Sequence, residues 1–209
     1  VSIGHLPAIA DRFFFFFHGA SVGRGYGPVV VARRPMTLAE LRGARVAVPG
    51  LRTTAHLVLR LLVAEATGAA AADVYRPVEI PITPFARVFE ALAHDEVDAA
   101  LLIHEGRLTY QDDPSLHRVV ELGEAWQQQT NLPLPLGGNV VRRDLPADLL
   151  TDISSACRQS IAWALRHRDH VLDAVLSSGA RAEVAPTRAR LDRYLAMYAN
   201  DDSAVFRPD

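Results

Sequence analysis

The sequence predicts an α/β protein with a mainly parallel sheet and two lobes that enclose a central cleft. Extended and helical patterns alternate through the first half of the chain, as they do where helices connect parallel strands. Two extended segments, residues 29–34 and 132–143, each end in a pair of arginines and bracket roughly a hundred residues, a common size for a small domain. We therefore expect two hinge strands there, with residues 36–136 as one lobe and residues 1–35 with 137–209 as the other.

Short apolar runs predict the strands. The five phenylalanines at residues 13–17 are far too few to span a membrane, and aromatic side chains favour strands, so we expect a buried strand there. Further runs bounded by glycine, proline or charged residues predict strands at residues 29–31, 45–48, 79–82 and 98–103.

Helices are expected where apolar residues recur every three or four positions. Thr53 is placed to cap one helix, and Pro84 opens another. After Pro146 the pattern is helical, with Cys157 on the apolar side as a core residue, and residues 188–198 form the last helix.

Charge and residue usage exclude several classes of function. With 24 acidic and 22 basic side chains the net charge is −2, and no basic block suggests a nucleic-acid surface. Every basic side chain is arginine, so no lysine can form a Schiff base or hold a nucleotide phosphate. The single cysteine and the spacing of the histidines do not match a zinc site, so we expect no metal.

The ends of the chain and its one cysteine suggest where the protein acts. The chain starts at Val1, inside an apolar stretch rather than at a methionine, so we expect a fragment that lacks its true start. A lone cysteine fits a reducing compartment, and we expect a cytoplasmic protein that binds small molecules rather than nucleic acid or membrane. The sequence gives no indication of the oligomeric state.

His104 is the leading candidate for a general base. It follows the apolar strand expected at residues 98–103, and parallel sheets bind ligands beyond the carboxyl ends of their strands. A histidine that only satisfies a backbone carbonyl at a strand end is an alternative of equal weight. His56 could face the same cleft, although a solvated surface position is favoured. His167 and His170 are explained by favourable interaction with a helix end.

Two other sets of polar residues are candidates for ligand contact. Thr53 and Thr54 lie at a helix N-terminus, where hydroxyls and free amides could hold a carboxylate, but capping by one threonine is the commoner outcome. Glu105 and Arg107 are expected to pair with neighbours, with substrate contact as the less favoured alternative. The glycines in residues 23–27 lack the spacing and the following helix of a dinucleotide site.

Four strings in the chain are similar to strings of one enzyme family. They are Gly23-Arg24-Gly25 with Gly27-Pro28, Val46-Ala47-Val48-Pro49-Gly50 with Thr53-Thr54-Ala55, Ile103-His104-Glu105-Gly106-Arg107-Leu108-Thr109-Tyr110, and Leu132-Pro-Leu-Pro-Leu-Gly-Gly138. Over most of residues 1–145 the chain resembles the 1,4-dihydroxy-6-naphthoate synthases of the futalosine route to menaquinone. The helical tail matches only loosely.

The resemblance implies a fold, a reaction and a site. The fold is that of type II periplasmic binding proteins, with two lobes, used for catalysis. The reaction cleaves cyclic dehypoxanthinyl futalosine, a small carboxylate, to 1,4-dihydroxy-6-naphthoate and a three-carbon fragment, as a lyase without metal or redox cofactor. His104 matches the catalytic histidine. The positions that match ligand contacts or line the same cleft are Ser2, Thr53, Thr54, Ala55, Leu136, Gly137 and Gly138.

The chain departs from the family pattern at two places, and two other functions are alternatives. A Pro-Asn-Asp-Thr-Phe element of the family's N-terminal segment is absent, and the tail after Tyr198 lacks the expected glycine. The alternatives are a solute-binding protein for an aromatic carboxylate and the sister enzyme chorismate dehydratase. His104 argues against both, because transport needs no base and the resemblance gives the dehydratase no His-Glu-Gly-Arg string.

Overall fold

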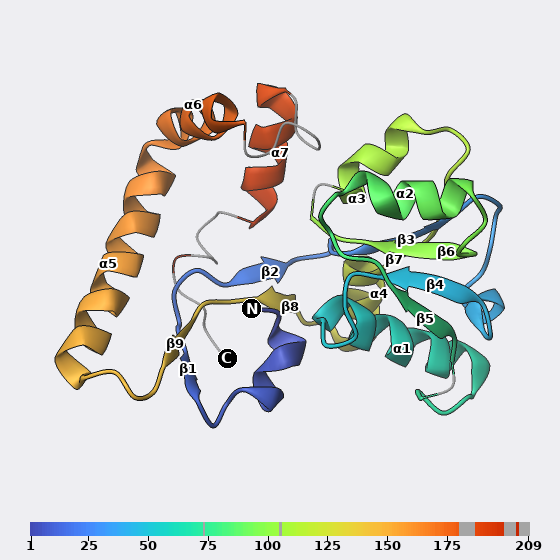
Figure 1. The fold of residues 1–209 in the computed structure, drawn as a ribbon, viewed down its shortest axis with the longest axis horizontal. Coiled ribbons are helices and arrows are strands. Elements are labelled where there is room, and N and C mark those ends of the chain that lie inside the picture. The colour runs from blue at the N-terminus through green and yellow to red at the C-terminus, as the bar shows by residue number, and fades with distance from the viewer. Residues whose placement is uncertain (73, 105, 180–186, 199–203, 205–209) are drawn as a thin grey trace. The chain divides into compact units, whose positions relative to one another are not determined.

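The computed structural model describes the chain except for residues 73, 105, 180–186, 199–203 and 205–209 (Figure 1). It divides into two compact units, one formed by Val1–Gly23 with Pro135–Asp209 and the other by Arg24–Leu134. The second boundary lies close to the expected one, whereas the first lies before residue 24 rather than after residue 35. The lobe assignment from the sequence remains a prediction.

The unit Arg24–Leu134 is built on a five-stranded sheet in the order β5-β4-β6-β3-β7. β4 pairs in parallel with β5 and β6, as expected from alternating strands and helices, whereas β3 runs antiparallel to β6 and β7. The strands in chain order are β3 (Val29–Ala32), β4 (Arg45–Val48), β5 (Arg76–Glu79), β6 (Ala99–Leu102) and β7 (His117–Glu121). β5 begins three residues earlier than expected and contains Pro77, which an edge strand tolerates.

The segment expected as a hinge strand at residues 29–34 contains β3, an interior strand of this sheet. All four residues of β3 are buried, and β3 lies between β6 and β7. A run of consecutive apolar residues is what a strand needs when both faces of its sheet are covered. The segment from β3 to β4 contains only one 3₁₀ turn, η2 (Ala39–Leu41), so the chain re-enters the sheet at the end where it left.

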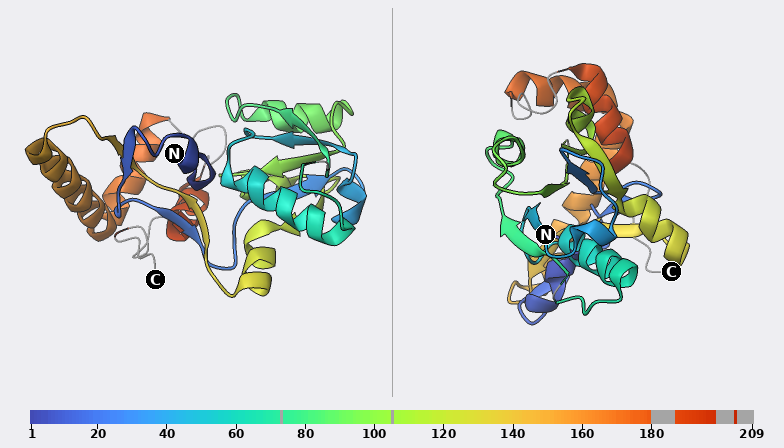
Figure 2. Two further views of the ribbon diagram at one scale, coloured as in Figure 1. Left: turned by 90° about the horizontal axis from the view of Figure 1, so that it is seen from below. Right: turned by 90° about the vertical axis from the view of Figure 1, so that its right-hand side faces the viewer.

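Helices cover both faces of the sheet. α1 (Thr54–Thr67) and α4 (Leu122–Thr130) lie on one side, with α2 (Ala86–Ala93) and α3 (Gly106–Thr109) on the other (Figures 1 and 2). Ala91 and Leu92 of α2 pack against alternate strand residues, which include Val29, Val31, Ala47, Ala100 and Leu102. The strand residues between them face the opposite side, so both helix layers share one sheet as their core.

Among its described residues, the other unit contains two small sheets and three α-helices. β1 (Phe13–Phe15) pairs antiparallel with β9 (Val140–Arg142), and β2 (Ser21–Gly23) pairs with β8 (Leu134–Gly137). The helices are α5 (Ala147–Arg166), α6 (Arg168–Ser178) and α7 (Arg188–Tyr198), preceded near the start of the chain by the 3₁₀ helix η1 (Ile3–Ala8).

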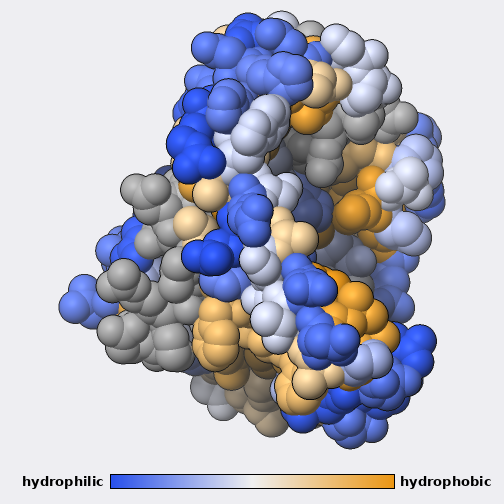
Figure 3. All heavy atoms as spheres, turned by 90° about the vertical axis from the view of Figure 1, so that its left-hand side faces the viewer, coloured by the Kyte–Doolittle hydropathy of each residue, from blue (hydrophilic) through white to orange (hydrophobic). Residues whose placement is uncertain are grey.

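Two expectations for this unit are wrong. The phenylalanine run is not buried, because β1 belongs to a two-stranded ribbon; Phe14 is 39% and Phe17 is 55% exposed, and Phe14 packs under the guanidinium of Arg143. Cys157 is half-buried rather than in a core, since no described residue of α5 is buried. Figure 3 shows hydrophobic patches among hydrophilic residues on one face of the molecule. No helix within the described residues is long and apolar enough to cross a membrane.

Candidate active site

The carboxyl ends of β4 and β6 bring together the candidate residues of the unit Arg24–Leu134. These strands pair in parallel, so the residues that follow them emerge on the same side of the sheet. We call this side, where the parallel strands end, the carboxyl edge. Thr53 and Thr54 follow β4, and His104 follows β6. Residues that are fifty positions apart in the chain therefore share one edge.

His104 is exposed just beyond β6. Its backbone φ of 52° lies in the left-handed region, which costs a residue other than glycine roughly 1–2 kcal/mol. The turn is closed by the amide of Gly106, which donates to the carbonyl of Ile103 at 3.1 Å. An exposed imidazole at this edge can reach a ligand that binds there.

Thr53 caps α1, as the sequence predicts. Its Oγ1 accepts from the amide of His56 at 3.2 Å and donates to the carbonyl of Gly50 at 2.8 Å. Thr54 and Ala55 are buried, and their amides belong to the first helical turn, which has no acceptors within the helix. These amides and the positive end of the helix dipole are what this corner offers to an anion.

His56 is buried, which corrects the solvated position expected for it. Its Nδ1 lies 2.9 Å from the hydroxyl of Tyr75, and the two rings meet edge to face. Burial lowers the pKa of His56, the charge of Arg60 lowers it further, and Glu79 opposes the shift. Burial also raises the pKa of Tyr75. The sequence pattern could not reveal this partner, because Tyr75 comes from the segment that leads into β5.

Sequence analysis does not single out Glu79, the last residue of β5. Its Oε1 accepts from the amide of Leu51 at 2.8 Å, so it lies against the turn between β4 and α1. A lone glutamate at a strand end follows no motif. Only the parallel pairing of β4 with β5 places it beside the threonine corner.

A small apolar pocket lies at the same edge of the sheet. Its lining combines the ends of β4 and β6 with the start of α2: Val48, Pro49, Ile80, Pro81, Ile82, Phe85, Val88, Leu101, Leu102 and Ile103. An apolar wall beside a few polar groups is typical of sites for small organic ligands.

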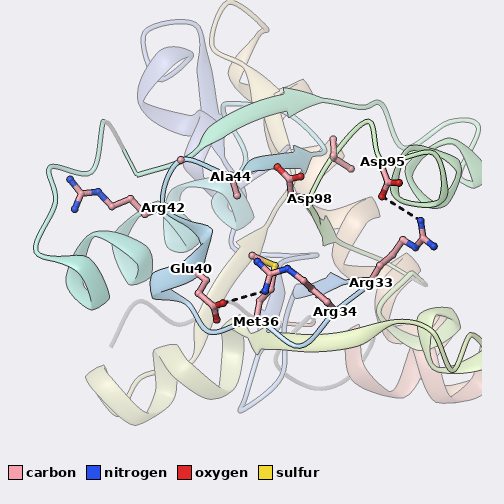
Figure 4. A pocket seen from close by; sticks show the side chains of 10 residues that line it. Arg33, Arg34, Met36, Glu40, Arg42, Ala44, Asp95 and Asp98 are labelled. Atoms are coloured by element: carbon pink, nitrogen blue, oxygen red, sulfur yellow. Dashed lines mark hydrogen bonds and ion pairs between the residues drawn. The ribbon is translucent and has the colours of Figure 1, made fainter.

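A larger cavity of about 600 Å³ lies at the opposite edge of the sheet (Figure 4). Arg33 pairs there with Asp95 at 3.3 Å, and Arg34 pairs with Glu40 at 3.2 Å, as the dashed lines show. These pairs are largely exposed, and the acidic side chains offset the arginines around the hollow. The cavity is remote from His104, at the other end of β6.

Ser2, Gly137 and Gly138 come together in the other unit. Ser2 forms a β-bridge with Gly137, and its Oγ donates to the carbonyl of Leu136 at 3.3 Å. A side chain at Gly138 would overlap the ring of Phe15, so this position requires glycine. The structure explains these residues by local packing, and their contact with a ligand stays a prediction.

The fold belongs to the periplasmic-binding-protein-like class. The alkanesulfonate-binding protein SsuA of Xanthomonas axonopodis pv. citri matches with a TM-score of 0.60 at 18% identity, covering 89% of this chain and 60% of that one. A crystal structure of an Archaeoglobus fulgidus protein matches with a TM-score of 0.83 at 38% identity, covering 100% of this chain and 71% of that one.

The chain is a member of the menaquinone biosynthesis family, whose model matches residues 1–209. Two curated relatives are both named 1,4-dihydroxy-6-naphtoate synthase. The one from Thermus thermophilus is 42% identical over 79% of this chain, and the one from Streptomyces coelicolor is 35% identical over 100% of it. The chain spans 55% of the length of the first relative and 70% of the second. The family membership suggested by the sequence strings is thus confirmed.

Proposed function

We propose that this protein is a carbon–carbon lyase that cleaves cyclic dehypoxanthinyl futalosine to 1,4-dihydroxy-6-naphthoate in menaquinone biosynthesis. The observation that carries the proposal is the exposed, left-handed His104 at the carboxyl edge of β6. The names of the two curated synthases support it, as does a fold used elsewhere to bind small solutes.

His104 acts in this proposal as the general base. Its imidazole removes a proton from a substrate hydroxyl and so starts a cleavage of the retro-aldol kind. When the hydroxyl loses its proton, its oxygen forms a carbonyl, the adjacent carbon–carbon bond breaks, and the electron pair passes to the departing carbon, which later takes up a proton. The electrons balance without an oxidant, so the proposed step requires no redox cofactor.

Histidine is the side chain best suited to act as the general base in this step. A free imidazole is largely neutral at pH 7 and so accepts a proton there. The sequence contains no lysine, so the alternative of a Schiff base is closed. Glu79 is the last residue of β5, the strand beside β4. Its carboxylate already accepts a hydrogen bond from the amide of Leu51.

The substrate carboxylate is proposed to bind at the N-terminus of α1. The hydroxyl of Thr53 donates to Gly50, so the donor we assign to the carboxylate is the first-turn amide of Ala55, with Thr53 setting its geometry as the cap. Ser2, Gly137 and Gly138 are proposed as further ligand contacts on the strength of the family resemblance.

The proposed setting is the cytoplasm, with a small carboxylate as the partner. A single cysteine is compatible with a reducing compartment. A net charge of −2 gives no reason for nucleic acid to bind.

Incubation of the purified protein with cyclic dehypoxanthinyl futalosine tests the proposal, with release of the naphthoate followed by chromatography. Product formation that is lost in His104→Asn supports the lyase. Tight binding of an aromatic carboxylate without turnover would favour a solute-binding protein. Conversion of chorismate in its place would favour the dehydratase.

A further inference from the structure

Glu121, the last residue of β7, is a buried carboxylate that gathers three donors. It is only 5% exposed, and its Oε2 accepts from the amide of Glu124 at 2.6 Å, which caps α4. Its Oε1 accepts from the amide of Gly27 and from the guanidinium of Arg107, the latter at 3.2 Å. A buried carboxylate requires this kind of saturation, because an unpaired one is costly.

Arg107 completes the network from α3. Its side chain is 12% exposed, its Nε donates to the carbonyl of Gly27 at 2.7 Å, and its guanidinium lies over the ring of Tyr26. Gly27 is therefore held at both backbone groups, its amide by Glu121 and its carbonyl by Arg107. The planar fork of arginine presents donors to both partners in a fixed geometry, whereas the three donors of a lysine ammonium group rotate about one nitrogen.

Close packing holds both residues 26–27 and the start of α3. A side chain at Gly123 would overlap the backbone of Tyr26, so the start of α4 and residues 26–27 are in backbone contact. A side chain at Gly106 would overlap the ring of Phe85, so the start of α3 is pressed against the start of α2. α3 has only four residues, too few for a helix to be stable by its own hydrogen bonds.

We propose that Arg107 is a positioning residue that aims His104, a role that rests on the proposed base. His104 lies three residues before Arg107 in a strained left-handed conformation, which persists only where its surroundings determine it. The link from Arg107 to Gly27 and Glu121 fixes the C-terminal side of that turn to β7 and to the segment before β3. The imidazole of His104 therefore extends from a turn that Arg107 anchors to the buried residues Gly27 and Glu121.

The kinetic test compares wild type with Arg107→Gln, Arg107→Lys, His104→Asn and the double variant His104→Asn/Arg107→Gln. We expect Arg107→Gln to lower kcat by about 10- to 100-fold with KM changed less than about 3-fold, because a misplaced base loses rate rather than binding. Arg107→Lys should recover part of the loss. In the His104→Asn background the Arg107→Gln substitution should have no further effect, because two residues that act as a unit are not additive.

A matched control separates positioning from a general loss of an ion pair. Arg45→Gln removes a doubly hydrogen-bonded pair with Asp98 at the opposite edge of the same sheet and should leave kcat unchanged. Wild-type kcat in folded Arg107→Gln, or a penalty that adds in full to that of His104→Asn, overturns the positioning role. Failure of both Arg107 variants to fold does so too, in favour of a purely structural pair. Full activity in His104→Asn would instead refute the proposed base, so the two failures are distinguishable.

Discussion

The Nδ1 atom of His56 lies 2.9 Å from the hydroxyl oxygen of Tyr75, and both side chains are buried. This contact ties the first turn of α1 to the segment that leads into β5. It connects the threonine corner to the core of its unit through one hydrogen bond. Burial lowers the pKa of His56, so the stability of the unit depends on pH.

The free energy of unfolding should depend on pH through His56. The pKa of His56 is lower in the folded protein than its ordinary value of about 6.5, so below pH 6.5 the unfolded state binds a proton that the folded state does not. The free energy of unfolding should therefore fall as the pH drops below about 6.5 and level off once the folded pKa is passed. Urea unfolding between pH 7.5 and 5, compared with His56→Gln, measures it. An equal slope in both proteins would contradict the assignment.

Removal of the Tyr75 hydroxyl should also destabilise the unit. Tyr75→Phe leaves a ring nitrogen of His56 without its partner, and a buried unsatisfied polar group costs about 1–3 kcal/mol. Denaturant unfolding at pH 7.5 provides the measurement. Tyr110→Phe, a half-buried tyrosine of the same unit, is a suitable control, and a loss of equal size there would show that the effect is not specific to the contact with His56.

The threonine corner should separate capping from ligand binding. Thr53→Ala removes the hydroxyl that caps α1 by accepting from the amide of His56. This change should lower the free energy of unfolding by about 1 kcal/mol. Replacement of both Thr53 and Thr54 by valine should weaken product binding as well, measured by titration calorimetry with the naphthoate. If affinity is unchanged in the folded double variant, the threonine side chains are caps and take no part in binding the product.

His104 should control turnover rather than binding. Loss of a general base reduces rates by roughly 10² to 10⁴, so His104→Asn, similar in size and still able to hydrogen bond, should lower kcat by about that factor with little change in KM. Circular dichroism confirms folding, and His94→Asn near the end of α2 is a control that should keep full rate. Near-full turnover in His104→Asn would move the base to another residue.

Gly106 should tolerate no side chain while Phe85 keeps its position. Gly106→Ala places a methyl group in the Phe85 ring and should lower kcat through displacement of the turn that carries His104. The double variant Gly106→Ala/Phe85→Ala should recover part of that loss, because the larger side chain is gone. Gly43→Ala is a control for substitution of glycine, since no atom lies near its added methyl, although its positive φ also carries a local strain. A Gly106→Ala variant with wild-type kcat and stability would contradict the packing argument.

Several elements follow from local signals in the amino-acid sequence. The cap at Thr53, the helix at residues 188–198 and the buried strand that leads to His104 were each predictable, because capping, helical periodicity and continuous apolar runs are written in neighbouring residues. The strings around His104 likewise carried the family, which the family model confirms across the chain.

Tertiary structure alone decided which of these elements meet. The direction of β3, the burial of His56 against Tyr75, the place of Glu79 beside the α1 turn, and the network of Arg107, Gly27 and Glu121 all join segments distant in sequence. Strand order and burial depend on the packing of the whole unit, since a residue's environment is supplied by chain that no local pattern describes. The phenylalanine run is the opposite case, because its strong strand preference was met by a two-stranded ribbon that leaves Phe14 partly exposed.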